Sequence, residues 1–461
     1  MTGAGHGGSE MSATATRGPQ HASQQGGPAG VPPAGAPPAR GRRRFLRAST
    51  TPGKLRLLLV GLVAACLAWG ALAALTVSQH ASAADAVVAT DEPLSLDAQQ
   101  IYQSLADADV TVSAGYLVGR TPPFEDRERY QHDVTVAAAD LKAATAASGN
   151  SSIGASLAAL TQALPVYTGY VEDGQIYNSL GFPAGGSFIE VASEEMQLTL
   201  LPAAHSVYAQ ENAQLKAASA QATGLPLAVI AVVAGLVLAI ILFRAQRWLS
   251  GRTHRTVNTG LLLTSAAGLA ALVWLVVALA SGRADLVQAG GHGSGPAETL
   301  AQADITALQA RDDQLLNLIS RAGDADTLNL FAGDQSRLDA LLADASANSA
   351  AAGVGKVAAA RSDADAWFAV NQRAQALDKA NSYGAETQLV IGSGPDTAAT
   401  LFGTLEGDLN AAIASNQAVF TSNAAAGQSA FTGLEAGIVV LAVGMAVGCA
   451  WGLSRRLAEY R

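Results

Sequence analysis

Four long apolar stretches decide what this chain can fold into. Each approaches the roughly 20 apolar residues that are needed to cross a bilayer, and none carries a charge in its interior. The stretches are Leu57–Val77, Leu225–Phe243, Leu261–Ala280 and Ala436–Leu453. A soluble protein rarely holds four such runs, so the sequence predicts an integral membrane protein.

The apolar stretches belong to a unit that occurs twice. The segment Leu105–Thr111 (LADADVT) returns as Leu300–Thr306 (LAQADIT), an offset of 195 residues. Each copy lies in a unit in which two apolar stretches flank one long polar segment. The sequence therefore predicts an internal duplication, with two related domains displayed on one side of the membrane.

Charge is distributed unevenly between the polar segments. Residues 1–56 hold eight Lys or Arg, the connector 244–258 holds four, and the residues after Ser454 hold three. The long segments are acidic instead: 80–224 has 5 bases and 17 acids, and 282–433 has 8 bases and 17 acids. Positively charged flanks stay in the cytoplasm. We therefore expect a multi-pass protein of the cell membrane with both termini in the cytoplasm, lipid as a contact and no nucleic-acid partner.

The first apolar stretch has three interpretations. Val63–Cys66 is similar to a lipoprotein cleavage box, and Ala81–Ala83 is similar to a signal-peptidase site. The apolar run continues past Cys66 and is longer than the core of an ordinary signal peptide. An uncleaved span is the interpretation that the sequence favours. Cys66 and Cys449 are the only cysteines, so thiol chemistry is excluded from the large polar segments.

Both polar segments are typical of helical bundles. In the first, the helical spacing of Leu94, Ile101, Leu105 and Val112 predicts one helix before a break at Arg120–Phe124. Turn residues predict further helices at 124–147, 153–180 and 187–224, the last opened by a capping box at Ser187–Glu190. In the second, they predict helices at 296–321, 334–350, 354–390 and 396–430. The fold class is all-α, with four transmembrane helices and two duplicated extracytoplasmic four-helix bundles.

The resulting domain plan has nine parts. Residues 1–40 are rich in Gly, Pro, Ala, Ser and Gln, which predicts disorder. The parts are a disordered cytoplasmic tail (1–54), span 1 (55–78), bundle 1 (79–224), span 2 (225–244), a cytoplasmic connector (245–258), span 3 (259–281), bundle 2 (282–433), span 4 (434–454) and a cytoplasmic tail (455–461).

Residues that carry chemistry are few. The sequence shows no nucleophile, metal-ligand or phosphate-loop motif, so we expect no enzyme, no metal and no cofactor. Arg120, Arg127 and Arg129 cluster near one loop of the first polar segment and are candidates for binding a ligand carboxylate. The alternative is that they only offset the neighbouring acids Glu125, Asp126 and Glu128. Gly444, Gly448 and Gly452 recur every four residues in the last span, which favours close helix packing.

The layout resembles the GlnX-type four-span membrane proteins of actinobacteria, and more generally the helical ectodomains of chemoreceptors. The resemblance covers 55–461 by architecture, spacing and duplication. It implies a signalling role in which a solute-binding lipoprotein outside reports amino-acid supply to a Ser/Thr protein kinase inside.

Three functions remain open from the sequence. The first is a relay subunit between a binding protein and a kinase. The second is a direct small-molecule receptor, and the third is a structural scaffold of the envelope without a ligand. In the relay, we expect the fourth helix of each bundle to carry the signal into the span that follows it.

Overall fold

A computed structural model describes residues 51–148, 153–253, 258–321 and 325–458. The structure is 92% helical, and the described residues form no strand. Four helices are long and apolar enough to cross a membrane. The all-α class and the four spans are therefore confirmed. The predictions for 1–50, for the turn at 149–152, for the connector 254–257 and for the last residues lie outside the described part.

Each half of the chain runs through a similar series of helices. The first half holds α1 (Thr51–Ala86), the π-helical turn η1 (Val87–Asp91), α2 (Glu92–Val118), α3 (Phe124–Ser148), α4 (Gly154–Ser179), α5 (Ala184–Glu195), η2 (Met196–Leu200), α6 (Leu201–Ala222) and α7 (Pro226–Thr253). The second half holds α8 (Thr259–Ala289), η3 (Gly290–Ser294), α9 (Gly295–Ser320), α10 (Ala325–Asn348), α11 (Ala351–Lys379), α12 (Tyr383–Ile391), α13 (Ala398–Ser429) and α14 (Leu434–Ala458). We call these halves the first and second units.

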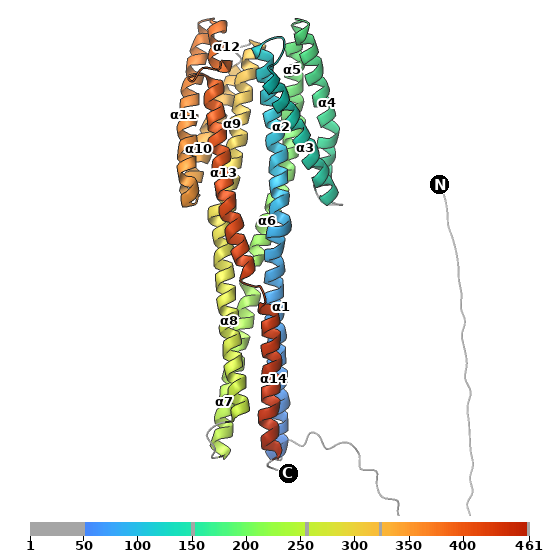
Figure 1. Ribbon diagram of the computed structural model, residues 1–461, viewed down its shortest axis with the longest axis vertical. Coiled ribbons are helices and arrows are strands. Elements are labelled where there is room, and N and C mark those ends of the chain that lie inside the picture. The colour runs from blue at the N-terminus through green and yellow to red at the C-terminus, as the bar shows by residue number, and fades with distance from the viewer. Residues whose placement is uncertain (1–50, 149–152, 254–257, 322–324, 459–461) are drawn as a thin grey trace, which may run out of the picture.

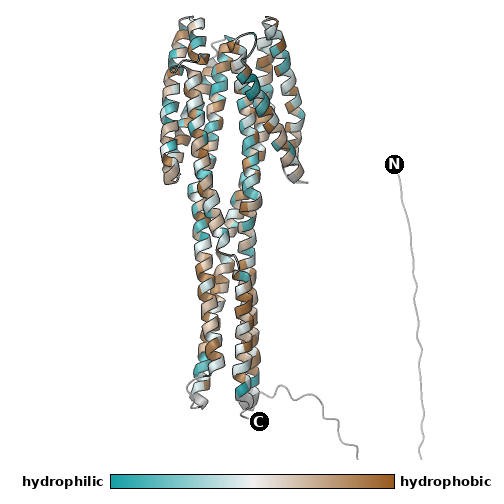
Figure 2. Ribbon diagram, in the orientation of Figure 1, coloured by the Kyte–Doolittle hydropathy of each residue, from teal (hydrophilic) through white to brown (hydrophobic). Residues whose placement is uncertain are grey.

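The molecule is a long rod with two regions (Figure 1). The membrane region consists of α1, α7, α8 and α14, and the remaining helices form the head. The start of α1, the end of α7, the start of α8 and the end of α14 all lie at the end remote from the head. Hydrophobic residues dominate the membrane region, while polar residues are frequent in the head (Figure 2).

The first helix of each unit does not stop at the membrane. α1, η1 and α2 form one continuous helix over Leu55–Val118, and α8, η3 and α9 form another over Thr259–Ser320. The sequence placed the end of the first span at residue 78 and of the third at residue 281. The structure instead continues each of these spans without interruption into the head. By contrast, the helix breaks at 223–225 and at 430–433 separate the last helices of the head from α7 and α14.

Three prolines explain where the π-helical turns occur. Pro93, Pro202 and Pro296 each stand two residues after such a turn. Proline cannot donate a backbone hydrogen bond, and its ring collides with the carbonyl group four residues earlier in an α-helix. The wider π-helical turn adjusts this part of the hydrogen-bond ladder. Pro202 lies inside the helix predicted at 187–224, and η2 allows the helix to continue past this proline.

The two units are interleaved in the membrane region. α1 packs most extensively against α14, which also packs along α8, while α7 contacts both α8 and α1. The Nε1 group of Trp69 on α1 donates a hydrogen bond to the carbonyl oxygen of Ala231 on α7, at 3.0 Å. The four spans thus form one bundle.

The head has a central core that both units build. α2 and α6 of the first unit pack beside α9 and α13 of the second, while α3–α5 and α10–α12 lie on opposite sides (Figure 1). One hydrophobic cluster extends through both units, from Ala98 to Ile413. The two predicted bundles are therefore joined into a single packed body.

Some predicted boundaries are wrong. α5 already begins at Ala184, and no side chain caps it, so Ser187 lies inside the helix and forms no capping box. The predicted helix 354–390 is interrupted between α11 and α12, where Asn381 adopts a left-handed conformation with φ of 52°. α10 begins at Ala325, nine residues earlier than predicted.

The equivalent helices of the two units are offset by 203 residues, not by the 195 residues that separate the similar segments Leu105–Thr111 and Leu300–Thr306. Val87 and Gly290, which begin the equivalent turns η1 and η3, are 203 residues apart, as are Pro93 and Pro296. Leu105 and Leu300, by contrast, occupy different turns of α2 and α9. The order of helices, rather than the 195-residue offset, relates the units.

Candidate functional site

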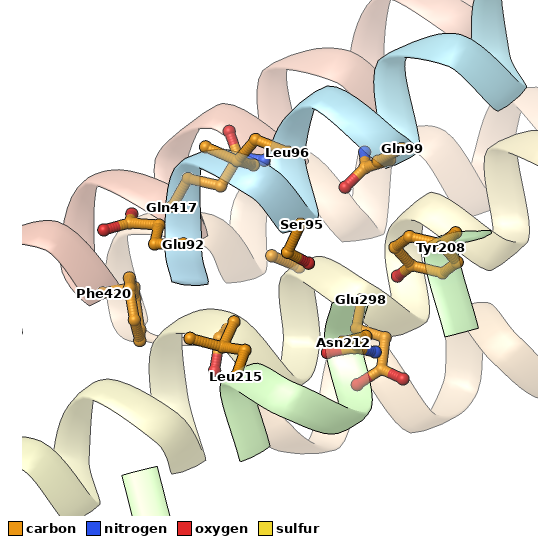
Figure 3. A pocket seen from close by; sticks show the side chains of 12 residues that line it. Glu92, Ser95, Leu96, Gln99, Tyr208, Asn212, Leu215, Glu298, Gln417 and Phe420 are labelled. Atoms are coloured by element: carbon orange, nitrogen blue, oxygen red, sulfur yellow. The ribbon is translucent and has the colours of Figure 1, made fainter. Parts of the chain in front are cut away.

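A polar pocket lies in the central core, at the base of the head. α2, α6, α9 and α13 enclose it, so both units contribute (Figure 3). Its volume is about 40 Å³, which is room for a few water molecules. The lining residues are Glu92, Ser95, Leu96, Gln99, Tyr208, Asn212, Leu215, Ser294, Ala297, Glu298, Gln417 and Phe420.

Helical spacing brings these polar groups to one place. Glu92, Ser95 and Gln99 follow one another at intervals of three and four residues, so they share the face of α2 that points into the core. Tyr208 and Asn212 do the same on α6. Glu92 is 9% exposed, and its burial raises the pKa of the carboxyl group, an effect that a 3.0 Å hydrogen bond from Thr421 opposes.

An ion pair at the rim of the pocket joins the two units. The Lys216 ammonium group on α6 lies 2.8 Å from a carboxylate oxygen of Glu298 on α9. Lys216 is largely exposed, so the pair adds little to stability but fixes how α6 lies against α9.

Two carboxyl groups meet further up the core. Asp109 on α2 and Asp312 on α9 are 3% and 4% exposed. The Ser193 hydroxyl oxygen lies 2.7 Å from Asp109 Oδ2 and 2.9 Å from Asp312 Oδ2. Ser113 and Gln197 donate to Asp312 at 3.1 and 2.9 Å. The pair therefore joins the first unit's α2, α5 and η2 to the second unit's α9.

The hydrogen bonds decide how charge is shared by this pair. Burial and the negative charge of Asp312 raise the pKa of Asp109 well above its ordinary value. Burial also raises the pKa of Asp312, but donation from Ser193, Gln197 and Ser113 counteracts this. Asp109 therefore holds a proton more firmly than Asp312 does. Any movement of α2 along α9 has to separate these groups or change their protonation.

The three candidate arginines do not form one site. Arg129 donates to Asp107 at 2.7 and 2.8 Å and to Glu406 of the second unit at 2.7 Å, so it bridges the units. The Arg127 guanidinium group lies 5.9 Å from the centre of the Phe124 ring. Arg120 covers Gly181, where an added Cβ atom would approach its guanidinium group to 2.8 Å. The ligand-binding role stays a prediction.

The glycines of the last span divide into two groups. Gly448 and Gly452 lie against Gly260 of α8, close enough that an added Cβ at Gly452 would be 3.1 Å from the Gly260 Cα. A Cβ at Gly448 would be 2.5 Å from the Thr264 hydroxyl oxygen. Gly444 has no such neighbour among the described residues within 4 Å. Two of the three glycines thus allow α8 and α14 to approach closely.

The sequence contains a pattern that places both members of the carboxyl pair on apolar helical faces. Asp109 occupies the apolar face of its helix, after Ile101 and Leu105, at intervals of four residues. Asp312 stands likewise four residues after Leu308. An acid on a buried helical face needs a partner, but the sequence does not say which one.

Comparison with known proteins identifies one part of the chain. Residues 83–220 match the family described as the Actinobacterial sensor domain. The head of the first unit is therefore similar to this sensor domain. The match runs from the last turn of α1 to the end of α6. With four apolar helices, it supports an actinobacterial membrane sensor. No curated protein and no solved structure matches the chain.

Proposed function

We propose that the chain is a transmembrane relay subunit, which passes a signal received by the head outside the cell to a cytoplasmic Ser/Thr protein kinase. The sensor-domain match supports a role in sensing. The basic residues near Arg244 and after Ser454 support cytoplasmic termini. An amino-acid-binding lipoprotein as the external partner and the kinase as the internal one come from the resemblance to GlnX-type proteins. In this proposal the partner kinase carries out the enzymatic step, and the chain itself is not an enzyme.

The observation that carries this proposal is the continuity of two helices. α1–η1–α2 and α8–η3–α9 line the polar pocket, hold Asp109 and Asp312, and continue through the membrane region. Packed helices shift as units between discrete arrangements, so a shift in the core of the head moves the spans. We therefore move the signal path from the fourth helix of each bundle to the first, because the fourth helices are interrupted at 223–225 and 430–433.

Crosslinking between two native cysteines can report this movement of the helices. Its two cysteines, Cys66 on α1 and Cys449 on α14, are buried and adjacent in the membrane region. We expect Asp109→Asn and Ser193→Ala, both in the head, to change the rate at which an added copper–phenanthroline oxidant joins these cysteines in isolated membranes. An unchanged rate in both variants would refute coupling along the helices.

Two glycine insertions distinguish a signal path along the first helix of each bundle from a path along the fourth helix. Four glycines inserted after Ala89, within η1, should abolish the effect of the head variants on cysteine crosslinking. The matched insertion after Thr432, where the helix is already interrupted, should leave that effect in place. If the insertion after Thr432 abolished the effect and the insertion after Ala89 left it in place, the signal would pass along the fourth helix instead. Phosphorylation of cytoplasmic proteins under changing amino-acid supply, compared between these insertions, tests the kinase.

A direct receptor is the second candidate. The polar pocket and its position between both units favour it, because a ligand there would touch four helices at once. Binding of candidate amino acids to the purified chain, without a lipoprotein, would decide for the receptor. No observation specifically favours a scaffold.

A further inference from the structure

A second polar cavity lies at the end of the head furthest from the membrane region. α9, α10, α11 and α12 of the second unit enclose it, away from the core shared by both units. The residues that matter for its chemistry are Asp313, Gln314, Asn317, Phe331, Asn371 and Glu386. Its volume is about 20 Å³, room for one group of the size of a water molecule.

Two buried carboxyl groups face this cavity. Asp313 is 8% exposed and Glu386 is 4% exposed. Among the described residues, neither carboxylate accepts a hydrogen bond or belongs to an ion pair. The Oδ1 atom of Asn317 is also buried without a partner. Buried carboxylates are normally paired, so this set lacks a cation or a group of donors.

The nearest engaged amide is that of Gln314. Gln314 accepts a hydrogen bond from the buried Arg311 guanidinium group and donates one to Asn371 Oδ1 at 2.7 Å. Arg311 also donates to the carbonyl oxygen of Val390 at 3.2 Å. These bonds hold Gln314 in place, and an amide carries no charge with which to neutralise Asp313 or Glu386.

The fold does not require these acids. At the positions 203 residues earlier, the first unit has Val110 in place of Asp313 and Ala114 in place of Asn317. Val110 belongs to the hydrophobic core there. A helix in this position therefore packs well without polar groups, and the second unit differs in this respect.

We propose that this cavity binds an ammonium group, either the free ammonium ion or the head of a small primary amine. An ammonium nitrogen offers only donors, and the cavity offers acceptors from Asp313, Glu386 and Asn317. The size fits, because the ammonium ion occupies about the space of one water molecule. A divalent cation fits less well, since calcium takes 6–8 oxygen ligands.

The ionisation of the Asp313 and Glu386 carboxyl groups suits a cationic ligand. Burial, reinforced by the charges of Asp312 and Asp334, raises the pKa of Asp313 to about 7. Burial and the charge of Asp378 raise the pKa of Glu386 to about 7 as well. Both groups are thus partly ionised at neutral pH, and a bound cation would stabilise the ionised form.

α12 is the wall through which a ligand can enter. It has nine residues and carries Glu386 and Val390. The turn at Asn381 precedes it, and residues 392–397 separate it from α13, which runs towards the membrane region. A larger amine requires α12 to move outwards. The inference deepens the proposed sensor by naming a ligand class for the head.

Thermal unfolding of the full chain in detergent tests the proposal. Ammonium chloride should raise the melting temperature above that in sodium chloride or tetramethylammonium chloride of equal ionic strength. A larger shift with methylammonium chloride or glycine than with ammonium chloride would identify an amine as the ligand. Equal melting temperatures in all of these solutions would overturn the proposal.

Two isosteric variants separate binding from a structural role. Asp313→Asn and Glu386→Gln remove a buried charge, so without ammonium they should melt at the same or a higher temperature than the native chain. Both should lose the ammonium-dependent shift. Asp365→Asn, an exposed position on α11, should keep it. If the acid variants do not fold, Asn317→Ala should reduce the shift instead. A full shift in these variants would rule the site out, while the relay proposal would stand because the assay contains no partner.

Discussion

Asp109 and Asp312 lie side by side at the centre of the head, where the Ser193 hydroxyl group holds them together at 2.7 and 2.9 Å. They come from different units, and the sequence separates them by 203 residues. Because both are buried, their energy depends on their protonation, on the donors around Asp312 and on the relative position of α2 and α9.

Ser193→Ala should destabilise the head. A buried carboxylate that loses a donor costs about 1–3 kcal/mol, and here one hydroxyl group serves two carboxyl groups. Chemical denaturation followed by circular dichroism measures the change. Ser187→Ala, an exposed serine on the same helix, should stay within about 0.5 kcal/mol of the native chain. Equal stability of both variants would contradict the bridging role.

The stability of the head should fall as pH rises from 5 to 8. Burial raises the pKa of Asp304 to about 7, and the pKa values of Asp313 and Glu386 are also raised to about 7. In the unfolded chain these groups titrate near 4. Between these values the folded state binds more protons than the unfolded state, so raising the pH costs stability.

Melting temperatures at several pH values in ammonium-free buffer measure this effect. The double variant Asp313→Asn/Glu386→Gln should have a shallower slope between pH 5 and pH 8, because two of the responsible groups no longer titrate. A melting temperature that rises with pH over this range would show that these carboxyl groups are not buried as described.

Most helices and all four spans could be predicted from the sequence, but the way in which the helices pack against one another could not. The spans and most helices follow from apolar runs and helical spacing, which are local properties. The continuity of α1 into α2 was missed because the first span was ended where its apolar run ends, whereas the π-helical turn before Pro93 keeps the helix intact. The contact of Arg129 with Glu406, and of Asp109 with Asp312, depends on how two distant segments pack. No local pattern encodes that choice.

Gly448→Ala should destabilise the membrane region, whereas Gly444→Ala should not. A Cβ atom at Gly448 would collide with the Thr264 side chain, and overpacking of this kind costs about 1–3 kcal/mol. Gly444 has open space around it among the described residues. Thermal unfolding in the same detergent compares the two. Equal melting temperatures would contradict the close contact between α8 and α14.

Cysteine labelling checks the orientation in the membrane. In a Cys66→Ala/Cys449→Ala background, Ser382→Cys in the head should react with an impermeant thiol reagent in intact cells. Ser250→Cys, at the far end of α7, should react only after the cells are opened. Asn150→Cys should behave like Ser382→Cys. Labelling of Ser250→Cys in sealed cells would reverse the proposed orientation.

The packing of α1 against α14 determines the order in which this protein can mature. α1 leaves the ribosome first and α14 last, so the face of α1 that Cys66 and Gly70 occupy stays without its final neighbour until synthesis is nearly finished. Lipid or an insertion factor must shield that face in the meantime. Truncation before α14 would then leave an assembly intermediate exposed to quality-control proteases, even though three spans and most of the head are already made.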